Sequence, residues 1–454
     1  MTLERALLWA DESSDQALEV LKQLVAQPSV SVRSEGVLET AACLREVMEA
    51  AGIRTRLLET PGHPAIYGEA DGPPGAPTVL FYGHYDVQPP EPFELWDTPP
   101  FEPTVQNDRI YGRGVADNKG QHLCHIWAVR AWLETASELP VTVKFLIEGE
   151  EEIGSPHLAD LVQDQRDRLR ADVVYTSDGG MHPSGRPSVY FGVRGLLYVE
   201  VEVRGASADA HSGNKGNLLP QPAWELVELL HSLRGSDGRT AFPGFYNNVR
   251  SPSWEEEAML QTIPFDREGF LAEHGLDETH ISDGADYYRQ LAFEPTFNIA
   301  GLVSGYTGEG SKTIIPSRAL AKIDFRLVAD QDPDTVFEAF ARAVAERNPK
   351  AEVRRLVATP PSMTDPSLPV SKTVIDAVRE SWRIAPVVTA LGGTLPDYVF
   401  TRILGLPSVI VPYANHDEQN HAPNENLRLD CFFAGTRTTL HVLDALASHS
   451  KENT

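Results

Sequence analysis

Residues 78–89 constrain the fold of this chain more than any other stretch. They begin with a short apolar run of strand-forming side chains. The apolar run ends at Gly83, and two polar residues, His84 and Asp86, follow it two positions apart. A short apolar run bounded by turn residues is typical of a strand that is buried on both faces of a sheet. Functional sites in open α/β sheets lie just beyond the carboxyl ends of strands, so the sequence predicts His84 at such a site.

Similar apolar runs recur along the chain and alternate with helical patterns. Strands are predicted at 141–147 and 171–176, and a helix over 121–133 precedes them. From about residue 360 the same alternation resumes, with predicted elements at 371–382 (helix), 406–412 (strand) and 432–447 (helix). Alternating strands and helices predict an α/β fold with a mostly parallel sheet and helices on both faces.

The middle of the chain follows a different pattern. At 454 residues the chain is too long for a single hydrophobic core. Residues 196–203 and 319–328 alternate apolar and polar side chains, which is typical of half-exposed strands. We therefore predict a second, α+β domain at 193–358, inserted into a first domain made of residues 1–192 and 359–454. Within this insert, the acidic and aromatic stretch 243–290 matches no regular pattern.

The net charge and the cysteine content indicate which classes of binding partner and which cellular compartment to expect. The formal net charge of −26 argues against nucleic acid or an anionic membrane surface as a partner. Cys43, Cys124 and Cys431 are far apart and form no CxxC pair, so we expect free thiols and a cytoplasmic location. The first residues lack a long apolar segment, and neither a signal peptide nor a membrane span is expected.

Polar side chains follow several of the predicted strands. These are His84, the acidic run 150–152, Asp178 and a loop that carries His416 and His421, while Asp117 precedes a predicted helix. Imidazole together with carboxylate suits Zn²⁺, Co²⁺ or Mn²⁺ better than Ca²⁺. Five such groups exceed the three protein ligands of a catalytic zinc ion, and they suit two metal ions that share a bridging carboxylate.

Each of these features also has a simpler interpretation. An acidic run such as 150–152 is usually a solvated surface. Asp117 on its own could cap its helix, and Asp178 with the glycines that follow could form only a turn. Spacing alone does not separate His416 from His421. The coincidence of all these groups at strand ends is what favours a metal site.

Five motifs in order resemble those of a dinuclear metallopeptidase family, which includes carnosinase-type dipeptidases, glutamate carboxypeptidases, aminoacylases and succinyl-diaminopimelate desuccinylases. The resemblance extends from about residue 15 to 445. The motifs are residues 83–89, 112–120, 150–155, 177–178 and 421–425. The segment 310–316 is similar to the dipeptidase branch, although Ala210 stands where dipeptidases often have a larger apolar residue.

The resemblance implies two divalent metal ions per chain, with Zn²⁺ expected first and Mn²⁺ or Co²⁺ as alternatives. The implied ligands are His84 and Asp178 for one ion, Glu152 and His421 for the other, and Asp117 as the bridge. Glu151 would be the general base that activates water, and Asp86 would orient His84.

The resemblance extends to the inserted domain, and it implies that residues 193–358 form a lid and dimerisation domain on a catalytic domain made of residues 1–192 and 359–454. Residues 207–213 are similar to a motif whose histidine reaches into the partner subunit's site, so His211 is expected to act across a homodimer and stabilise an oxyanion. Arg326 lies in a strand similar to one that binds a substrate carboxylate. The turn that is similar to the family's substrate-lining turn consists of Gly392, Gly393 and Thr394.

The sequence therefore predicts a metal-dependent dipeptidase or carboxypeptidase for peptides that bear a free C-terminal carboxylate. An amidohydrolase for N-acylated amino acids would use the same groups and stays open as an alternative. A non-catalytic metal-binding protein is a third hypothesis. The presence of Glu151 beside a full ligand set argues against it, because a scaffold needs no base.

Overall fold

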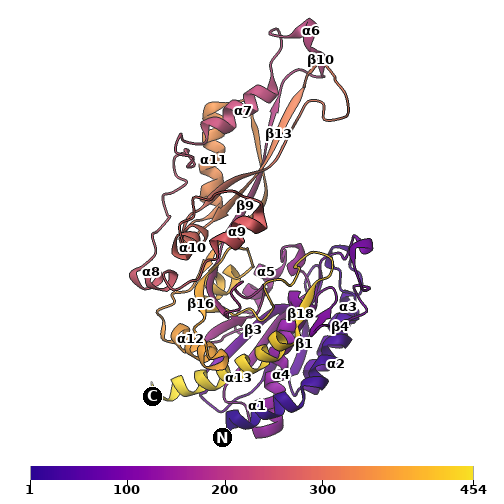
Figure 1. Cartoon of the computed structure of the whole chain (residues 1–454), viewed down its shortest axis with the longest axis vertical. Helices are drawn as coiled ribbons and strands as arrows, with labels where there is room; N and C mark the ends of the chain where they lie inside the picture. The colour runs from indigo at the N-terminus through magenta and orange to yellow at the C-terminus, as the bar shows by residue number, and fades with distance from the viewer. Residues whose placement is uncertain (1, 137, 453–454) are drawn as a thin grey trace.

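The computed structural model describes residues 2–136 and 138–452, which form two lobes (Figure 1). Among the described residues, the large lobe contains a nine-stranded sheet in the order β1-β2-β6-β3-β7-β17-β8-β15, with β16 beside β8. Its strands are β1 (Arg54–Leu58), β2 (Ala65–Ala70), β3 (Thr78–His84), β6 (Thr142–Glu148), β7 (Val173–Thr176), β8 (Ser188–Val193), β15 (Ser362–Met363), β16 (Val387–Leu391) and β17 (Ser408–Ile410).

The centre of the large sheet is parallel. Strand β3 pairs in parallel with β6 on one side and β7 on the other, and β7 pairs in parallel with β17. The edges are antiparallel, as in the pairs β1·β2 and β15·β8. This arrangement confirms the predicted α/β fold, and the stretch that begins at Thr78 is its central strand.

Helices cover both faces of the sheet. Successive side chains of a strand point to opposite faces, so a strand with apolar side chains on both faces needs a core on each side. In β3, Val79 and Phe81 pack into one core, and Leu80 and Tyr82 pack into the other. The first core is covered by α1 (Thr2–Glu12), α2 (Ser14–Val25), α3 (Val37–Ala50), α4 (Gly120–Ala136), α12 (Pro369–Trp382) and α13 (Leu429–Glu452). The second core is covered by α5 (Leu158–Asp164) and the π-helical segment η5 (Val399–Leu404).

The second lobe, which we call the lid, is built on a four-stranded antiparallel sheet in the order β11-β13-β9-β14. The strands are β9 (Gly195–Arg204), β11 (Thr296–Ser304), β13 (Arg318–Leu327) and β14 (Glu352–Thr359). The helices α7 (Pro222–Ser232) and α11 (Pro333–Arg347) cover one face, where every second residue of β9 is buried. Most of the alternate residues of β9 are only partly buried, which explains the alternating pattern in the sequence.

The chain crosses between the lobes twice. It leaves the large sheet after Val193 and enters the lid at Gly195, and it returns between Thr359 and Ser362. The division into domains at 1–192, 193–358 and 359–454 remains our proposal for the folding units.

The stretch 243–290, for which the sequence predicted no element, contains α8 (Trp254–Leu260), α9 (Arg267–His274) and most of α10 (Gly284–Phe293). These helices are short, and short helices carry little periodic signal. Leu260 and Phe293 pack with Val387 and Ala390 of β16, so this stretch joins the lid to the large lobe. No helix among the described residues has both the length and the apolar character needed to cross a membrane.

Candidate metal centre

The ends of three neighbouring strands meet at one edge of the large sheet. His84 is the last residue of β3 and lies in register with Glu148, the last residue of β6, so Glu151 and Glu152 follow at the same edge. Asp178 lies two residues beyond the end of β7. The parallel pairing thus brings together groups that the sequence spaces far apart.

Asp117 lies between two imidazole rings. Its Oδ1 atom is 2.9 Å from His84 Nε2, and its Oδ2 atom is 3.2 Å from His421 Nε2. Asp178 Oδ2 is 3.6 Å from His84 Nε2, and Glu152 Oε2 is 3.1 Å from His421 Nε2. Each oxygen of Asp117 therefore faces one imidazole, and each imidazole faces one further carboxylate.

The local backbone places Asp117 in this position. It lies in the π-helical segment η3 (Val115–Lys119), directly before α4, with the non-helical angles φ −116° and ψ 89°. On its C-terminal side, Asn118 Nδ2 donates to the carbonyl oxygen of Ser177 at 2.6 Å, which ties Asp117 to the segment that carries Asp178.

The electrostatics show an excess of buried carboxylate. Burial and the neighbouring Asp117 charge raise the pKa of Glu152 to about 7. Burial also raises the pKa of Asp178 and takes the pKa of Glu151 well above its usual value. Hydrogen bonds to Asp117 and Glu152 raise the pKa of His421 to about 10. In the metal-free chain these shifts favour the protonated forms of the carboxyl groups and of the imidazole, and divalent cations would supply the same positive charge.

The donor atoms fit metal ions. Atoms of His84, Asp117 and Glu152 lie within 4.8 Å of one another, close enough to belong to one metal centre. His84 Nε2 is buried and lies 2.9 Å from Asp117 Oδ1, but it makes no well-directed hydrogen bond. This ring nitrogen is therefore left for another ligand. Nitrogen and oxygen donors of this kind suit Zn²⁺, Co²⁺ or Mn²⁺.

Asp86 contacts both His84 and the acidic run. His84 Nδ1 is 3.1 Å from the backbone oxygen of Asp86 and 3.5 Å from its Oδ1. In a neutral His84 ring, donation from Nδ1 to that carbonyl would leave Nε2 without a proton, as a metal ligand requires. The Asp86 carboxylate accepts the backbone N–H groups of Glu151 and Glu152, each at 3.1 Å.

Sequence analysis missed one neighbour of the site, Gln88. Its side-chain Nε2 donates to Glu152 Oε2 at 2.9 Å, and its backbone N–H donates to Glu152 Oε1 at 3.1 Å. Both oxygens of Glu152 are therefore held in place. Gln88 lies in the same motif as His84, but an amide has no charge and gave no signal in the sequence.

A cavity of about 650 Å³ opens beside these groups. It is lined by residues of the large lobe and of the lid, including Asp117, Glu151, Glu152, Asp178, His421, Leu196 and Thr359. Gly393 and Thr394 also line it. Gly392 instead packs near Leu291. Arg326 Nη1 donates to Thr394 Oγ1 at 2.9 Å, so the guanidinium of Arg326 lies against the substrate turn that the sequence predicted.

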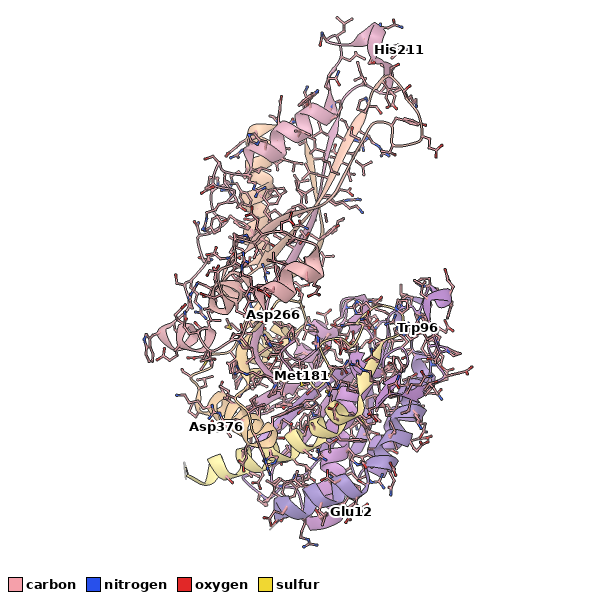
Figure 2. The ribbon with its side chains drawn as sticks, viewed as in Figure 1. Glu12, Trp96, Met181, His211, Asp266 and Asp376 are labelled. Carbon is pink, nitrogen blue, oxygen red and sulfur yellow. The ribbon has the colours of Figure 1, made fainter. Side chains whose placement is uncertain are left out.

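His211 lies far from this centre. It belongs to the short strand β10 (Ala210–His211), which pairs with β12 (Ile314–Ile315) and leads into α6 (Ser212–Lys215). Figure 2 shows His211 at the far tip of the lid, whereas Trp96 and Met181 lie in the large lobe. His211 is exposed at this tip, away from the metal centre of its own chain.

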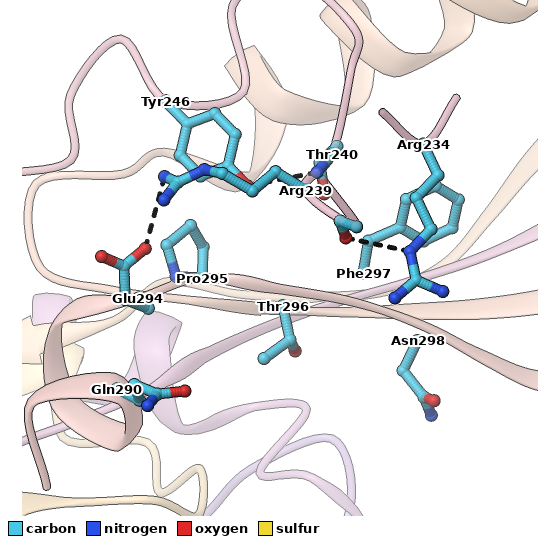
Figure 3. A pocket seen from close by; sticks show the side chains of 11 residues that line it. Arg234, Arg239, Thr240, Tyr246, Gln290, Glu294, Pro295, Thr296, Phe297 and Asn298 are labelled. Atoms are coloured by element: carbon cyan, nitrogen blue, oxygen red, sulfur yellow. Dashed lines mark hydrogen bonds and ion pairs between the residues drawn. The ribbon is translucent and has the colours of Figure 1, made fainter. Parts of the chain in front are cut away.

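A second cavity, of about 560 Å³, lies in the lid (Figure 3). Its lining includes no histidine and no cysteine, and its one carboxylate, Glu294, lies 3.5 Å from Arg239. The guanidinium of Arg239 also lies over the ring of Tyr246. This cavity therefore lacks the donor set of a metal site.

Comparison with known proteins places these features in a family. The model of peptidase family M20/M25/M40 matches residues 80–445. Human Beta-Ala-His dipeptidase is 30% identical over 462 residues, which cover 96% of this chain and 91% of that protein. A Cys-Gly metallodipeptidase of Schizosaccharomyces pombe is 28% identical over 474 residues and 99% of each chain.

Solved structures agree with these matches. An M20 family metallo-carboxypeptidase from Sulfolobus solfataricus superimposes with a TM-score of 0.88 at 36% identity, over 95% of this chain and 99% of that one. Human carnosine dipeptidase 1 superimposes with a TM-score of 0.82 at 29% identity, over 99% of both chains.

We predict that His421→Ala reduces the metal content of the protein and that His416→Ala does not. The imidazole of His421 lies 3.2 Å from Asp117 and 3.1 Å from Glu152, and among the described residues no such contact to these two carboxylates involves His416. Both variants would be loaded with Zn²⁺, freed of excess metal and measured by elemental analysis. Normal metal retention in His421→Ala would refute its place in the centre.

Proposed function

Because the chain belongs to peptidase family M20/M25/M40, we propose that it is a metal-dependent dipeptidase for dipeptides or short peptides with a free C-terminal carboxylate. The observation that carries this proposal is the Asp117 carboxylate between two imidazoles, with Glu151 on the wall of the same cavity. Dipeptidases from human and yeast that match this chain over nearly its whole length support the substrate class.

We propose that each half of the centre holds one divalent metal ion. His84 and Asp178 would hold one ion, Glu152 and His421 the other, and Asp117 would bridge them. The distances to the two imidazole nitrogens support this division. Zn²⁺ is expected first, with Mn²⁺ or Co²⁺ as alternatives, because these ions accept mixed imidazole and carboxylate ligands.

Bound metal ions polarise a carbonyl group and make water acidic enough to lose a proton near neutral pH. Glu151 is the group of the chain that would take that proton, because its carboxylate lines the cavity and is not among the proposed ligands. Burial, together with the charges of Asp178, Asp117 and Glu152, raises its pKa well above the usual value. A carboxylate with a raised pKa can also hold the proton and pass it to the leaving amine.

Thr394 lines the cavity, and Arg326, which donates a hydrogen bond to it, would bind the free carboxylate of the substrate. The hydrogen bond between them fixes the guanidinium, and a fixed guanidinium suits bidentate recognition of a carboxylate. The same pocket could receive an N-acylated amino acid, so the amidohydrolase stays an alternative. The dipeptidase relatives favour the first proposal. A non-catalytic metal-binding protein would have no use for Glu151.

We further propose a homodimer in which His211 completes the partner subunit's site. His211 is exposed at the tip of the lid, and β11 is an edge strand of the lid sheet. Large apolar side chains are exposed on the same lobe, namely Trp224 and Val227 on α7 and Leu302 and Val303 on β11. A second copy of the chain could cover such surfaces through a two-fold contact.

A cytoplasmic location is also part of the proposal. Cys43, Cys124 and Cys431 are all free, which suits a reducing compartment. The net charge of −26 disfavours nucleic acid or an anionic membrane as partner.

The substrate class is tested with a panel of dipeptides, N-acetylated amino acids and dipeptides amidated at the C-terminus. Protein reconstituted with Zn²⁺ should hydrolyse the dipeptides fastest. It should lose most activity on the amidated forms, because these lack the carboxylate that Arg326 would bind. Chelation should abolish turnover. Preferred cleavage of N-acetylated amino acids would favour the amidohydrolase instead.

Glu151→Gln should keep both metal ions and lose about 10²–10⁴ in kcat, because the amide cannot accept the proton of water. Glu150→Gln is the matched control. Glu150 precedes it in the chain, but its carboxylate is bound to His157 at 2.7 Å. Stopped assays and elemental analysis would be run on both variants. Wild-type turnover by Glu151→Gln would rule it out as the base.

Mixed dimers test the role of His211. Loss of one oxyanion donor typically costs about 10²–10³ in turnover, so His211→Ala should be nearly inactive. Glu151→Gln should be nearly inactive because it lacks the general base. A mixed dimer of the two has one site with both changes and one with neither. A random mixture should therefore regain about a quarter of wild-type activity. If labelled subunits exchange and no activity returns, His211 does not act across the interface.

A further inference from the structure

Glu425 is a fully buried carboxylate that binds the loop carrying Asp117. Its Oε2 accepts hydrogen bonds from Arg113 Nη1 at 2.8 Å and from the backbone N–H of Gly114 at 2.9 Å. Its Oε1 accepts the backbone N–H groups of Ala116 at 3.0 Å and of Asp117 at 3.1 Å. One side chain thus holds the backbone on the N-terminal side of Asp117, and also the N–H of Asp117 itself.

Arg113 extends the same connection toward His421. Its Nη2 donates to the backbone oxygen of Ala422, the residue after His421, at 3.2 Å. Only 1% of the Arg113 side chain is exposed, and its guanidinium lies 5.4 Å from the ring centre of Trp96. Arg113 and Glu425 therefore form a buried ion pair that contacts the backbone beside both Asp117 and His421.

The His421 loop needs such a tether. The His421 side chain is 54% exposed, and its backbone has a positive φ of 57°. Asp117 and His421 lie 304 positions apart in the sequence, so local chain geometry does not set the distance between them. Glu425 lies four residues after His421, directly before β18 (Asn426–Arg428), which pairs with β5 (Arg109–Tyr111).

We propose that the Arg113–Glu425 pair is a positioning device that sets the separation of Asp117 and His421, and thereby the affinity of the metal ion they would share. This inference rests on the proposed dinuclear site. Neither side chain would touch the metal. Groups that orient ligands typically change metal affinity by about 10–100-fold when they are removed.

The effect should be confined to one half of the centre. On the other side of Asp117, Asn118 donates to Ser177 and Gln121 donates to Gly179, and these bonds tie the loop to the segment around Asp178. They do not involve Glu425. Loss of the ion pair should therefore weaken the ion held by Glu152 and His421, and leave the ion held by His84 and Asp178 in place.

The test is a stepwise Zn²⁺ titration of the metal-free full-length chain, followed by competition with a chromophoric chelator. Wild type should bind two ions, and His421→Ala identifies the step that belongs to His421. In Glu425→Gln we expect that same step to weaken by about 10–100-fold and the other step to stay unchanged. The readout is metal binding and does not depend on activity.

Glu256→Gln is the matched control. Glu256 is also buried and paired with an arginine, since Arg250 donates to both of its oxygens at 2.6 and 2.7 Å. This pair lies at α8, away from the metal centre, so its loss should leave both titration steps unchanged. A general loss of packing would affect the two variants alike, whereas a positioning role affects only Glu425→Gln.

Arg113→Lys provides a second variant if Glu425→Gln does not fold. Lysine keeps the charge but lacks the forked geometry that reaches both Glu425 and Ala422, so the same step should weaken. Two unchanged steps in a folded Glu425→Gln or Arg113→Lys protein would overturn the inference while leaving the dinuclear site intact. A wild type that binds fewer than two ions would overturn the dinuclear site, and this inference with it.

Discussion

The contact of one carboxylate, Asp117, with two imidazoles is the interaction on which the rest of the centre depends. Its two oxygens lie 2.9 Å from His84 Nε2 and 3.2 Å from His421 Nε2. Glu152 and Asp178 lie against the same two rings. Buried negative charge is unfavourable unless positive charge offsets it. In the chain alone, imidazoles with raised pKa supply that charge, and in the proposed enzyme metal ions would supply it.

The large sheet positions the side chains of the metal centre relative to one another. Because β6, β3 and β7 are parallel neighbours, their carboxyl ends deliver side chains to one edge without any long loop. The groups behind the ligands then restrict their orientation. Asp86 binds the backbone of the acidic run, Gln88 binds both oxygens of Glu152, and Glu425 binds the loop of Asp117. Most of these bonds go to backbone groups, so they restrict loops as well as side chains.

The lid contributes surface to the same cavity. Leu196 and Thr359 lie at the two points where the lid sheet begins and ends, and both line the cavity. The hydrogen bond from Arg326 to Thr394 joins the lid sheet to a turn of the large lobe. The far tip of the lid, with His211, lies too far away to serve the same chain, so its proposed role requires a second copy (Figure 2).

The sequence by itself determined the class of fold and the chemistry of the centre. The apolar run that ends at His84 and the acidic residues after residues 141–147 are local patterns, which can be recognised without knowledge of tertiary contacts. The sequence did not predict α8 to α10, because short helices that pack between two lobes show little hydrophobic periodicity in the sequence. It also gave no sign of Gln88, or of a role for Glu425.

The spacing of His416 and His421 in one loop did not distinguish them, and only the family resemblance favoured His421 as the ligand. The tertiary structure places His421 against Asp117. It also decided that Glu425 contacts the backbone of Asp117, 308 positions away in the sequence. The pairing of strands and buried hydrogen bonds bring two such distant residues together, and neither can be predicted from short stretches of sequence.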